Sequence, residues 1–251
     1  MSAGNLIVML DPADVYEGTS SQRHYLGTLG ITPDGRKFRD GKNDGTVEVA
    51  GNLYSGAAAV AHHANIACDV ARAVGATAIS ATMGGTAAAA DLYAEGYVFG
   101  NDATGEGITY PIRRGWQTGS GHAAAGTSSV ITTNLWEGVT VQVALTTSSE
   151  VTFAQNTYKN VIIHGGPPVA TLVGVAPWAL TASYYGWYQT GGPSAALTAG
   201  TVVIGDVAVP STGTAGSVMP SAAFETDGPE VGNVMKVSAN TEYSLLYLRF
   251  D

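Results

Sequence analysis

Charged side chains are scarce in this sequence. Lys, Arg, Asp and Glu together supply 12% of the 251 residues, against ~25% in an average globular protein. The acids outnumber the bases by 20 to 11, which leaves a net charge of -9. A surface with so few cations is poorly suited to neutralising phosphates, so the composition argues against a protein that binds nucleic acid.

Cysteine and long apolar runs are lacking as well. The single cysteine, Cys68, excludes an intrachain disulfide framework and a metal site built from several thiolates. No run approaches the ~20 apolar residues that span a bilayer, so we expect no membrane partner. The first apolar run, Leu6–Leu10, lacks basic flanks and is too short for the core of a secretory signal, which predicts synthesis in a cytoplasm.

Glycine and hydrophobic residues are abundant instead. The chain has 33 Gly, and 45% of its residues are hydrophobic, enough to form a packed core. Short alternating runs stand between turns rich in Gly, Pro and Asp, which predicts an all-β protein of sandwich or barrel modules. The expected strands include Thr77–Met83, Val139–Leu145, Tyr184–Gln189, Ala195–Leu197 and Tyr243–Phe250.

The positions of the turn-forming clusters predict that the chain has three parts. Residues 1–55 are expected to form an extended N-terminal arm, as far as about residue 23, and then hairpins. Residues 56–164 are expected to form a β domain, and residues 169–251 a small C-terminal β-barrel. The boundary is placed at Gly165–Pro168, because neither a helix nor a central strand continues through such a cluster.

The stretch 57–74 is open to two interpretations. Ile66, Val70 and Val74 fall on one helical stripe, and Ala is a good helix former. Ile66, Cys68 and Val70 also alternate with small or polar residues, as in a strand. The sequence leaves helix and strand as alternatives here.

No pattern of reactive residues stands out. Adjacent His62 and His63 would point to opposite faces of a strand, so they would not converge on one metal ion. Ser120 lies close to His122, but the surrounding residues are not the Gly-x-Ser-x-Gly elbow of a hydrolase. We therefore expect no catalytic residue, no cofactor and no metal site, and we interpret the chain as a protein that is not an enzyme.

The densest aromatic cluster is the group Tyr184, Tyr185, Trp187 and Tyr188. On a strand, Tyr184 and Tyr188 would share one face, while Tyr185 and Trp187 would share the other. A strand that is apolar on both faces fits either between two cores or between a core and a subunit interface. Both alternatives remain open from the sequence, and a sugar-binding platform is a third.

Several segments resemble structural proteins of tailed bacteriophages that are encoded near the major capsid gene. The resemblance covers most of the chain from about residue 25 onward. It rests on five segments that occur in the same order: Asp34–Arg39, Val74–Thr77, Tyr93–Tyr97, Asn101–Tyr110 and Tyr184–Thr190. The last third also resembles the small β-barrels of proteins that decorate capsids.

This resemblance implies a function in the virion. It predicts a capsid decoration (cement) protein that binds the outside of a phage head, commonly as a homotrimer between subunits of the major capsid protein. The implied location is the capsid surface, after synthesis in the host cytoplasm. A head or tail fibre component that binds a host receptor or glycan is the alternative, although no heptad run of a fibre is visible.

Overall fold

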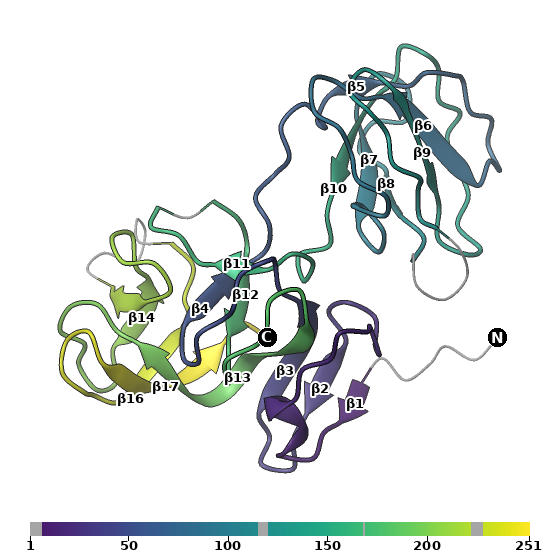
Figure 1. Ribbon diagram of the computed structural model, residues 1–251. Coiled ribbons are helices and arrows are strands. Elements are labelled where there is room, and N and C mark those ends of the chain that lie inside the picture. Colours follow the sequence, from purple (N-terminus) through teal and green to yellow (C-terminus); the bar gives the residue numbers. More distant parts are fainter. Residues whose placement is uncertain (1–6, 115–119, 168, 222–227) are drawn as a thin grey trace. The chain divides into compact units, whose positions relative to one another are not determined.

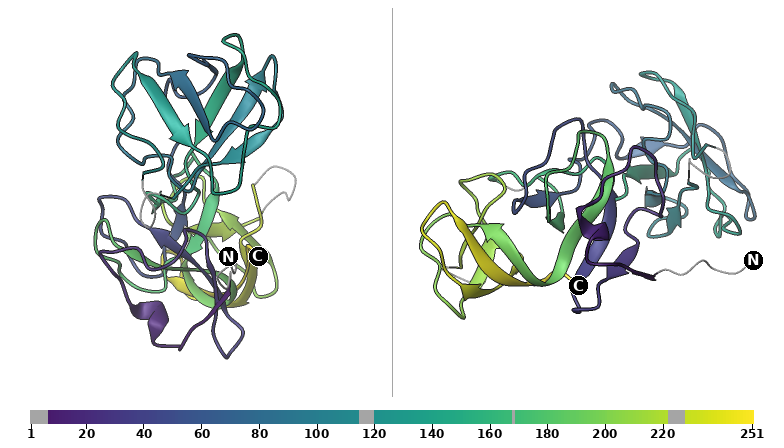
Figure 2. Two further views of the ribbon diagram at one scale, coloured as in Figure 1. Left: turned by 90° about the vertical axis from the view of Figure 1, so that its right-hand side faces the viewer. Right: turned by 60° about the horizontal axis from the view of Figure 1, so that its bottom comes forward.

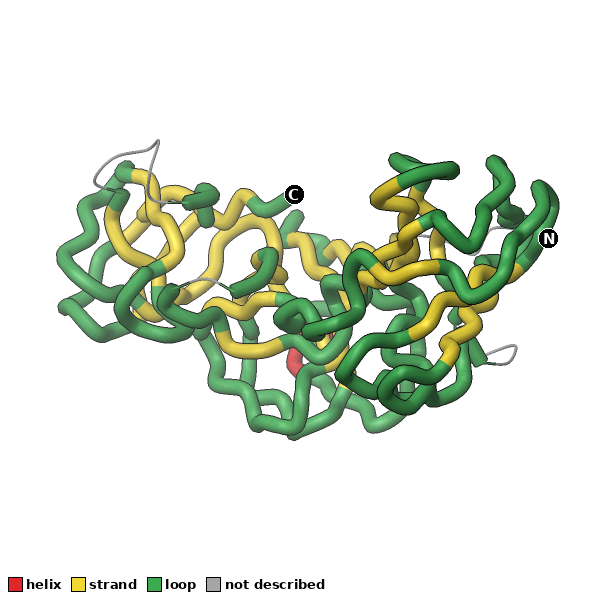
Figure 3. The backbone as a smooth tube through the Cα atoms, turned by 90° about the horizontal axis from the view of Figure 1, so that it is seen from above, coloured by secondary structure: helices red, strands yellow, loops and turns green. Residues whose placement is uncertain are grey.

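The chain folds almost entirely into strands and loops. The computed structural model describes residues 7–114, 120–167, 169–221 and 228–251. Among these residues, the only helical structure is one 3-10 turn, η1 (Asp14–Tyr16), drawn in red in Figure 3. The predicted all-β fold is confirmed.

The chain divides into two compact units. The first, called here the sheet unit, comprises Met1–Ala58 and Thr157–Asp251, and the second, the inserted unit, comprises Ala59–Asn156 (Figure 1). The inserted unit therefore interrupts the sequence of the sheet unit. Each unit has hydrophobic clusters made only from its own residues, as expected of separately packed cores.

The sheet unit contains one eleven-stranded sheet. Its strands are β1 (Ile7–Met9), β2 (Leu29–Ile31), β3 (Lys37–Lys42), β4 (Leu53–Ser55), β11 (Ile162–Ile163), β12 (Leu172–Val175), β13 (Tyr185–Leu197), β14 (Val207–Pro210), β15 (Val218–Pro220), β16 (Gly232–Lys236) and β17 (Tyr243–Arg249). The main path is β1-β2-β3-β13-β17-β16-β14-β15, while β4 pairs with β11 and β12, and β12 pairs with β13.

The long strand β13 is the centre of this sheet. Its first half pairs with β3 and its second half with β17, with a register shift between Gln189 and Gly191. The Gln189 amide donates to the carbonyl oxygens of Gly191 and Pro193, at 3.2 and 2.8 Å. The ribbon of β13 bends along its length (Figure 2). The two strands expected at Tyr184–Gln189 and Ala195–Leu197 are thus parts of one bent strand.

The C-terminal strands curve back toward β13. Thr198, directly after β13, forms an isolated bridge with Val218 of β15, and the N–H of Ala199 donates to the Val218 carbonyl at 2.7 Å. Hydrogen bonds therefore connect the first and last strands of the run β13-β17-β16-β14-β15. The predicted C-terminal barrel covers this run, but β13 also carries the N-terminal strand β3, so the run is not a separate domain.

The inserted unit has two smaller sheets. Its strands are β5 (Ile66–Ala67), β6 (Ala78–Thr82), β7 (Tyr97–Asp102), β8 (Thr109–Pro111), β9 (Val130–Asn134) and β10 (Glu150–Ala154). One sheet has the order β5-β10-β7-β8, and β6 pairs with β9 in the other. The ambiguous stretch 57–74 contains β5 and no helix.

The strand expected at Val139–Leu145 does not form. Val141 and Leu145 are buried, whereas Val143 is 41% exposed, and the backbone bonds to the segment 72–76 only at separate points. The N–H groups of Val141 and Leu145 donate to the carbonyls of Ala76 and Arg72, each at 2.8 Å. The segment is therefore a loop that packs against the core through Val141 and Leu145, and its alternating sequence does not correspond to a ladder of paired residues.

The N-terminal segment is not a free arm from residue 7 onward. β1 pairs in parallel with β2, and Leu10 and Val15 are buried together with Phe38 and Trp187. The apolar side chains of the segment therefore anchor it to the sheet. Residues 1–6 of the predicted arm lie outside the described residues.

The unit boundaries also differ from the three predicted parts. The predicted boundary at Gly165–Pro168 falls inside the sheet unit, whereas the chain passes between units at 58/59 and 156/157. The two passages lie close together, because a Cβ added to Gly56 would come within 2.8 Å of the Thr157 carbonyl oxygen.

This topology predicts that the sheet unit folds without the insertion. Replacing residues 59–156 by a short Gly-Ser linker should leave a protein with a β-type circular dichroism spectrum and one cooperative thermal transition, because all three of its hydrophobic clusters remain intact. A shortened chain that shows no cooperative unfolding would contradict the prediction.

Candidate functional site

The predicted aromatic cluster lies at the start of β13. Trp187 and Tyr188 are buried, whereas Tyr184 and Tyr185 are half-buried. Trp187 belongs to the cluster with Leu10, and Tyr188 belongs to a different cluster that includes Tyr54. The two faces of this strand therefore each meet a core, as in the first of the two alternatives left open by the sequence.

Tyr188 is paired with a buried acid that the sequence did not single out. Its hydroxyl donates to Glu48 Oε1 at 2.5 Å, and both side chains are nearly inaccessible. Burial raises the pKa of Glu48 to about 8, the nearby Asp44 charge adds to the rise, and the Tyr188 hydrogen bond opposes it. The Glu48 carboxyl is therefore mainly protonated at neutral pH.

An exposed apolar face lies on the second half of β13 and on β17. Tyr243, Leu245 and Tyr247 alternate with buried residues, and each exposes between 38% and 48% of its surface. Pro193 and Ala195 lie directly opposite Tyr247 and Leu245 on β13, so they share this face. These five residues are called the β17 face.

The β17 face continues into an open groove of about 770 Å³. Tyr243, Leu245, Pro193 and Ala195 line one part of the groove. Other lining residues are Tyr16, Arg36, Glu48, Val49 and Pro177. The groove therefore combines apolar and aromatic walls with few charged groups, which is the composition of an interface core rather than of a polar surface.

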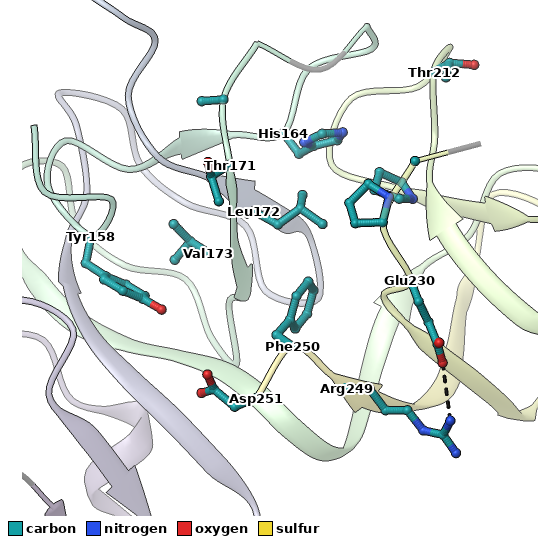
Figure 4. Close-up of a pocket in the computed structure, with 14 residues that line it drawn as sticks. Tyr158, His164, Thr171, Leu172, Val173, Thr212, Glu230, Arg249, Phe250 and Asp251 are labelled. Atoms are coloured by element: carbon teal, nitrogen blue, oxygen red, sulfur yellow. Dashed lines mark hydrogen bonds and ion pairs between the residues drawn. The ribbon is translucent and has the colours of Figure 1, made fainter. Parts of the chain in front are cut away.

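A second, smaller cavity lies beside β12. It has a volume of about 470 Å³, within the range of ~300–1,000 Å³ typical of ligand pockets. Leu172 and Phe250 lie near its centre, with Val173 and Tyr158 to one side and His164 above Leu172 (Figure 4). Glu230 and Arg249 form an ion pair of 3.4 Å at its rim.

The residues considered for catalysis do not form a reactive pair. The Ser120 hydroxyl lies 2.8 Å from Asp91 Oδ1 and 2.7 Å from the His122 carbonyl oxygen, whereas the His122 ring accepts the N–H of Tyr93 at its Nε2 atom. The other ring nitrogen, Nδ1, lies 2.8 Å from the Ala123 carbonyl. His122 therefore connects its own loop to the backbone at Tyr93.

The remaining histidines are dispersed. His62 lies 3.0 Å from the Thr86 hydroxyl, and His63 contacts the Tyr93 hydroxyl and the Thr86 carbonyl. Within the described ranges, no three His, Cys, Asp or Glu side chains gather in a way that could hold a metal ion. A helix that could cross a membrane is likewise not found in that part of the chain.

The β17 face left a pattern in the sequence, whereas the cavity beside β12 did not. The β17 face was visible as the alternation of Tyr243, Leu245 and Tyr247, although the exposed side could not be chosen because Leu246 and Leu248 are apolar as well. The cavity beside β12 had no local signal, since its walls come from segments near residues 158–173, 210–212 and 228–251.

The fold defines the class of the molecule as an all-β protein in which one unit is inserted into another. Comparison of the chain with protein-family models, with curated proteins and with solved structures finds no match.

Replacing Glu48 should make stability less dependent on pH. The folded state holds the Glu48 proton more tightly than the unfolded chain, in which the carboxyl titrates near 4.5. The associated stabilisation is therefore complete below that pH and declines as the pH rises to about 8. Glu48→Gln, which mimics the protonated acid, should gain on the order of 3 kcal/mol at pH 7 relative to wild type, and little at pH 4.

Thermal or urea unfolding across pH 4–9 would measure this difference. Glu17→Gln is the matched control, because the Glu17 side chain is 63% exposed. Parallel pH profiles for wild type and Glu48→Gln would contradict the assignment of a buried protonated acid.

Proposed function

We propose that this protein is a virion structural protein that decorates the outside of a phage head and stabilises it. Its partners would be the major capsid protein and further copies of itself, arranged as a homotrimer, and its final location would be the capsid surface. Binding, rather than turnover of a substrate, would be its activity. The sequence segments that resemble phage capsid-associated proteins support this proposal, and so does the character of the β17 face.

The observation that carries the proposal is the exposure of the β17 face. Fully burying a Leu or aromatic side chain contributes about 1.5–3 kcal/mol, and this face presents two Tyr and one Leu side by side. Contiguous exposed apolar residues of this kind mark surfaces that bind other proteins. We assign the β17 face to the contact with the capsid shell.

A trimer would strengthen a weak contact of this kind. Three copies held together engage three equivalent sites, and the second and third contacts form at a high effective concentration. The low charge of the chain is compatible with this arrangement, because few ionic groups must lose their hydration when the surfaces meet.

Disrupting the β17 face should abolish attachment to heads. The double variant Leu245→Ser, Tyr247→Ser should remain folded, because both side chains point outward, but should lose co-sedimentation with particles that lack the protein. Wild type should co-sediment and should raise the temperature at which the particles release DNA. Val143→Ser, at an exposed apolar position of the inserted unit, serves as the matched control and should bind like wild type.

Three outcomes would count against the proposal. They are wild type that stays in the supernatant, an unchanged DNA-release temperature, and a double variant that binds as well as wild type. Binding of wild type to host cells but not to heads would instead favour a fibre component that recognises a receptor.

The oligomeric state gives an independent prediction. Native mass spectrometry of the purified protein, or of protein released from particles, should show a species of three times the 25.6 kDa chain mass. A strict monomer both in solution and on the particle would contradict the trimer.

A further inference from the structure

We infer that the cavity beside β12 is a peptide-binding site, in which an extended apolar segment of a partner protein adds to the part of that strand's edge that β13 leaves unpaired. This inference concerns a surface other than the β17 face and does not require the partner to be a capsid protein. It rests on the direction of backbone groups in β12 and on the shape and lining of the cavity.

The backbone of β12 is paired on one side over more of its length than on the other. β4 pairs with Leu172, Gly174 and Val175, whereas β13 pairs with Val175 alone. The Gly56 N–H donates to the Thr171 carbonyl at 2.9 Å, so Thr171 directs its carbonyl toward β4. In an antiparallel pair the next residue directs its N–H and C=O away from that neighbour, and Leu172 therefore presents both groups to the opposite side.

The cavity lies along this opposite side. Figure 4 shows β12 with Leu172 and Val173 pointing in opposite directions from the strand, and both residues line the cavity. A segment laid along this edge would form main-chain hydrogen bonds with Leu172. Its side chains would alternate between the two directions, which is how added strands are recognised.

One side of the cavity suits a bulky apolar side chain. Leu172, Pro210, Pro229 and Phe250 line it, and Leu172 and Phe250 also pack against the cluster around Leu246 and Leu248. The floor is therefore already supported by the core of the sheet unit. A Leu, Ile or Phe side chain inserted here would bury its surface without a rearrangement of the backbone.

His164 supplies a polar group at the same cavity. Its side chain is 1% exposed, and its Nδ1 atom lies 2.7 Å from the Ser55 hydroxyl. Its Nε2 atom is buried and has no hydrogen-bond partner among the described residues. Burial lowers the pKa of His164. His164 follows β11, and β4 lies between β11 and β12, so the ring belongs to the part of the cavity wall beyond β4.

The charges around the cavity favour a neutral occupant. Arg249 is paired with Glu230 at 3.4 Å, and Arg39 is paired with Asp251 at 2.9 Å. Each cation is thus matched by an acid at the rim. A peptide with an uncharged apolar sequence would use both the backbone edge and the apolar side, whereas a small apolar molecule would leave the backbone groups of Leu172 unused.

A titration of the full-length, isotope-labelled protein tests this inference. The probe is acetyl-Val-Leu-Val-amide, followed by the backbone amide signal of Leu172 and the imidazole signals of His164. Both sets of signals should shift in a saturable way. A probe that carries N-methyl-leucine at its centre should bind roughly tenfold more weakly, as expected from the loss of one main-chain hydrogen bond.

A variant that fills the cavity provides the second arm. Thr171 is exposed and lines the cavity, so Thr171→Trp should fold normally. This variant should bind the probe roughly tenfold more weakly than wild type, or weaker still. Thr171→Ser is the matched control and should bind like wild type. Acetyl-Ser-Ser-Ser-amide should produce no saturable shift.

Four results would overturn the inference. They are the absence of shifts at Leu172 and His164, equal binding of the N-methylated or the serine peptide, unchanged binding by Thr171→Trp, and a Leu172 signal that changes with protein concentration before any probe is added. The last result would assign the edge to a second copy of this chain. None of these readouts uses capsids, so they are independent of the test of the proposed function.

Discussion

The sheet unit depends on the pairing of β13 with different partners along its length. The first half of β13 holds β3, and through it β2 and β1, while the second half holds β17 and the strands beyond it. The register shift near Gln189 lies between the two halves, and the Gln189 amide bonds to backbone carbonyls on the C-terminal side of the shift. A buried polar side chain thus stabilises the place where the strand changes partners.

Close contacts around β13 restrict which residues this arrangement accepts. Gly41 of β3 faces Tyr188, and a Cβ at that position would come within 2.7 Å of the Tyr188 ring. Tyr188 in turn contributes its hydroxyl to Glu48 and its ring to a contact with Tyr54, with centroids 6.1 Å apart. The interior is therefore tightly packed but not purely apolar, and its buried acid remains compatible with the core because it keeps its proton.

The same sheet carries both surfaces that we propose for binding. On the β17 face, side chains that would suit a core point outward, so recognition would depend on apolar area. Beside β12, the backbone itself is available, because neighbouring strands leave Leu172 unpaired on one side. The first kind of surface favours a broad partner, and the second favours a narrow extended one.

The sequence predicted the fold class but not the arrangement of the units. Alternation and Gly-rich turns reported strands correctly at Thr77–Met83 and Tyr243–Phe250, because the pattern there follows local backbone geometry. The pattern failed at Val139–Leu145, where a loop buries Val141 and Leu145 but leaves Val143 exposed. The joining of residues 1–58 to 157–251 had no local signal, since the pairing of β3 with β13 depends on contacts between distant segments. The cavity was invisible for the same reason, whereas the aromatic cluster was found because its members are adjacent.

The inserted position of residues Ala59–Asn156 has a consequence for the order of folding. Within that unit, the N–H of Phe153 donates to the carbonyl of His63 at 3.1 Å, so its folding brings the two ends of the insertion together. The pairing of β4 with β11 and β12 would otherwise require closure of a long flexible loop, with a corresponding entropic cost. Early folding of the insertion brings β4 close to β11 and β12, so that only a short loop remains to be closed. The folding rate of the whole chain then depends on this shorter loop.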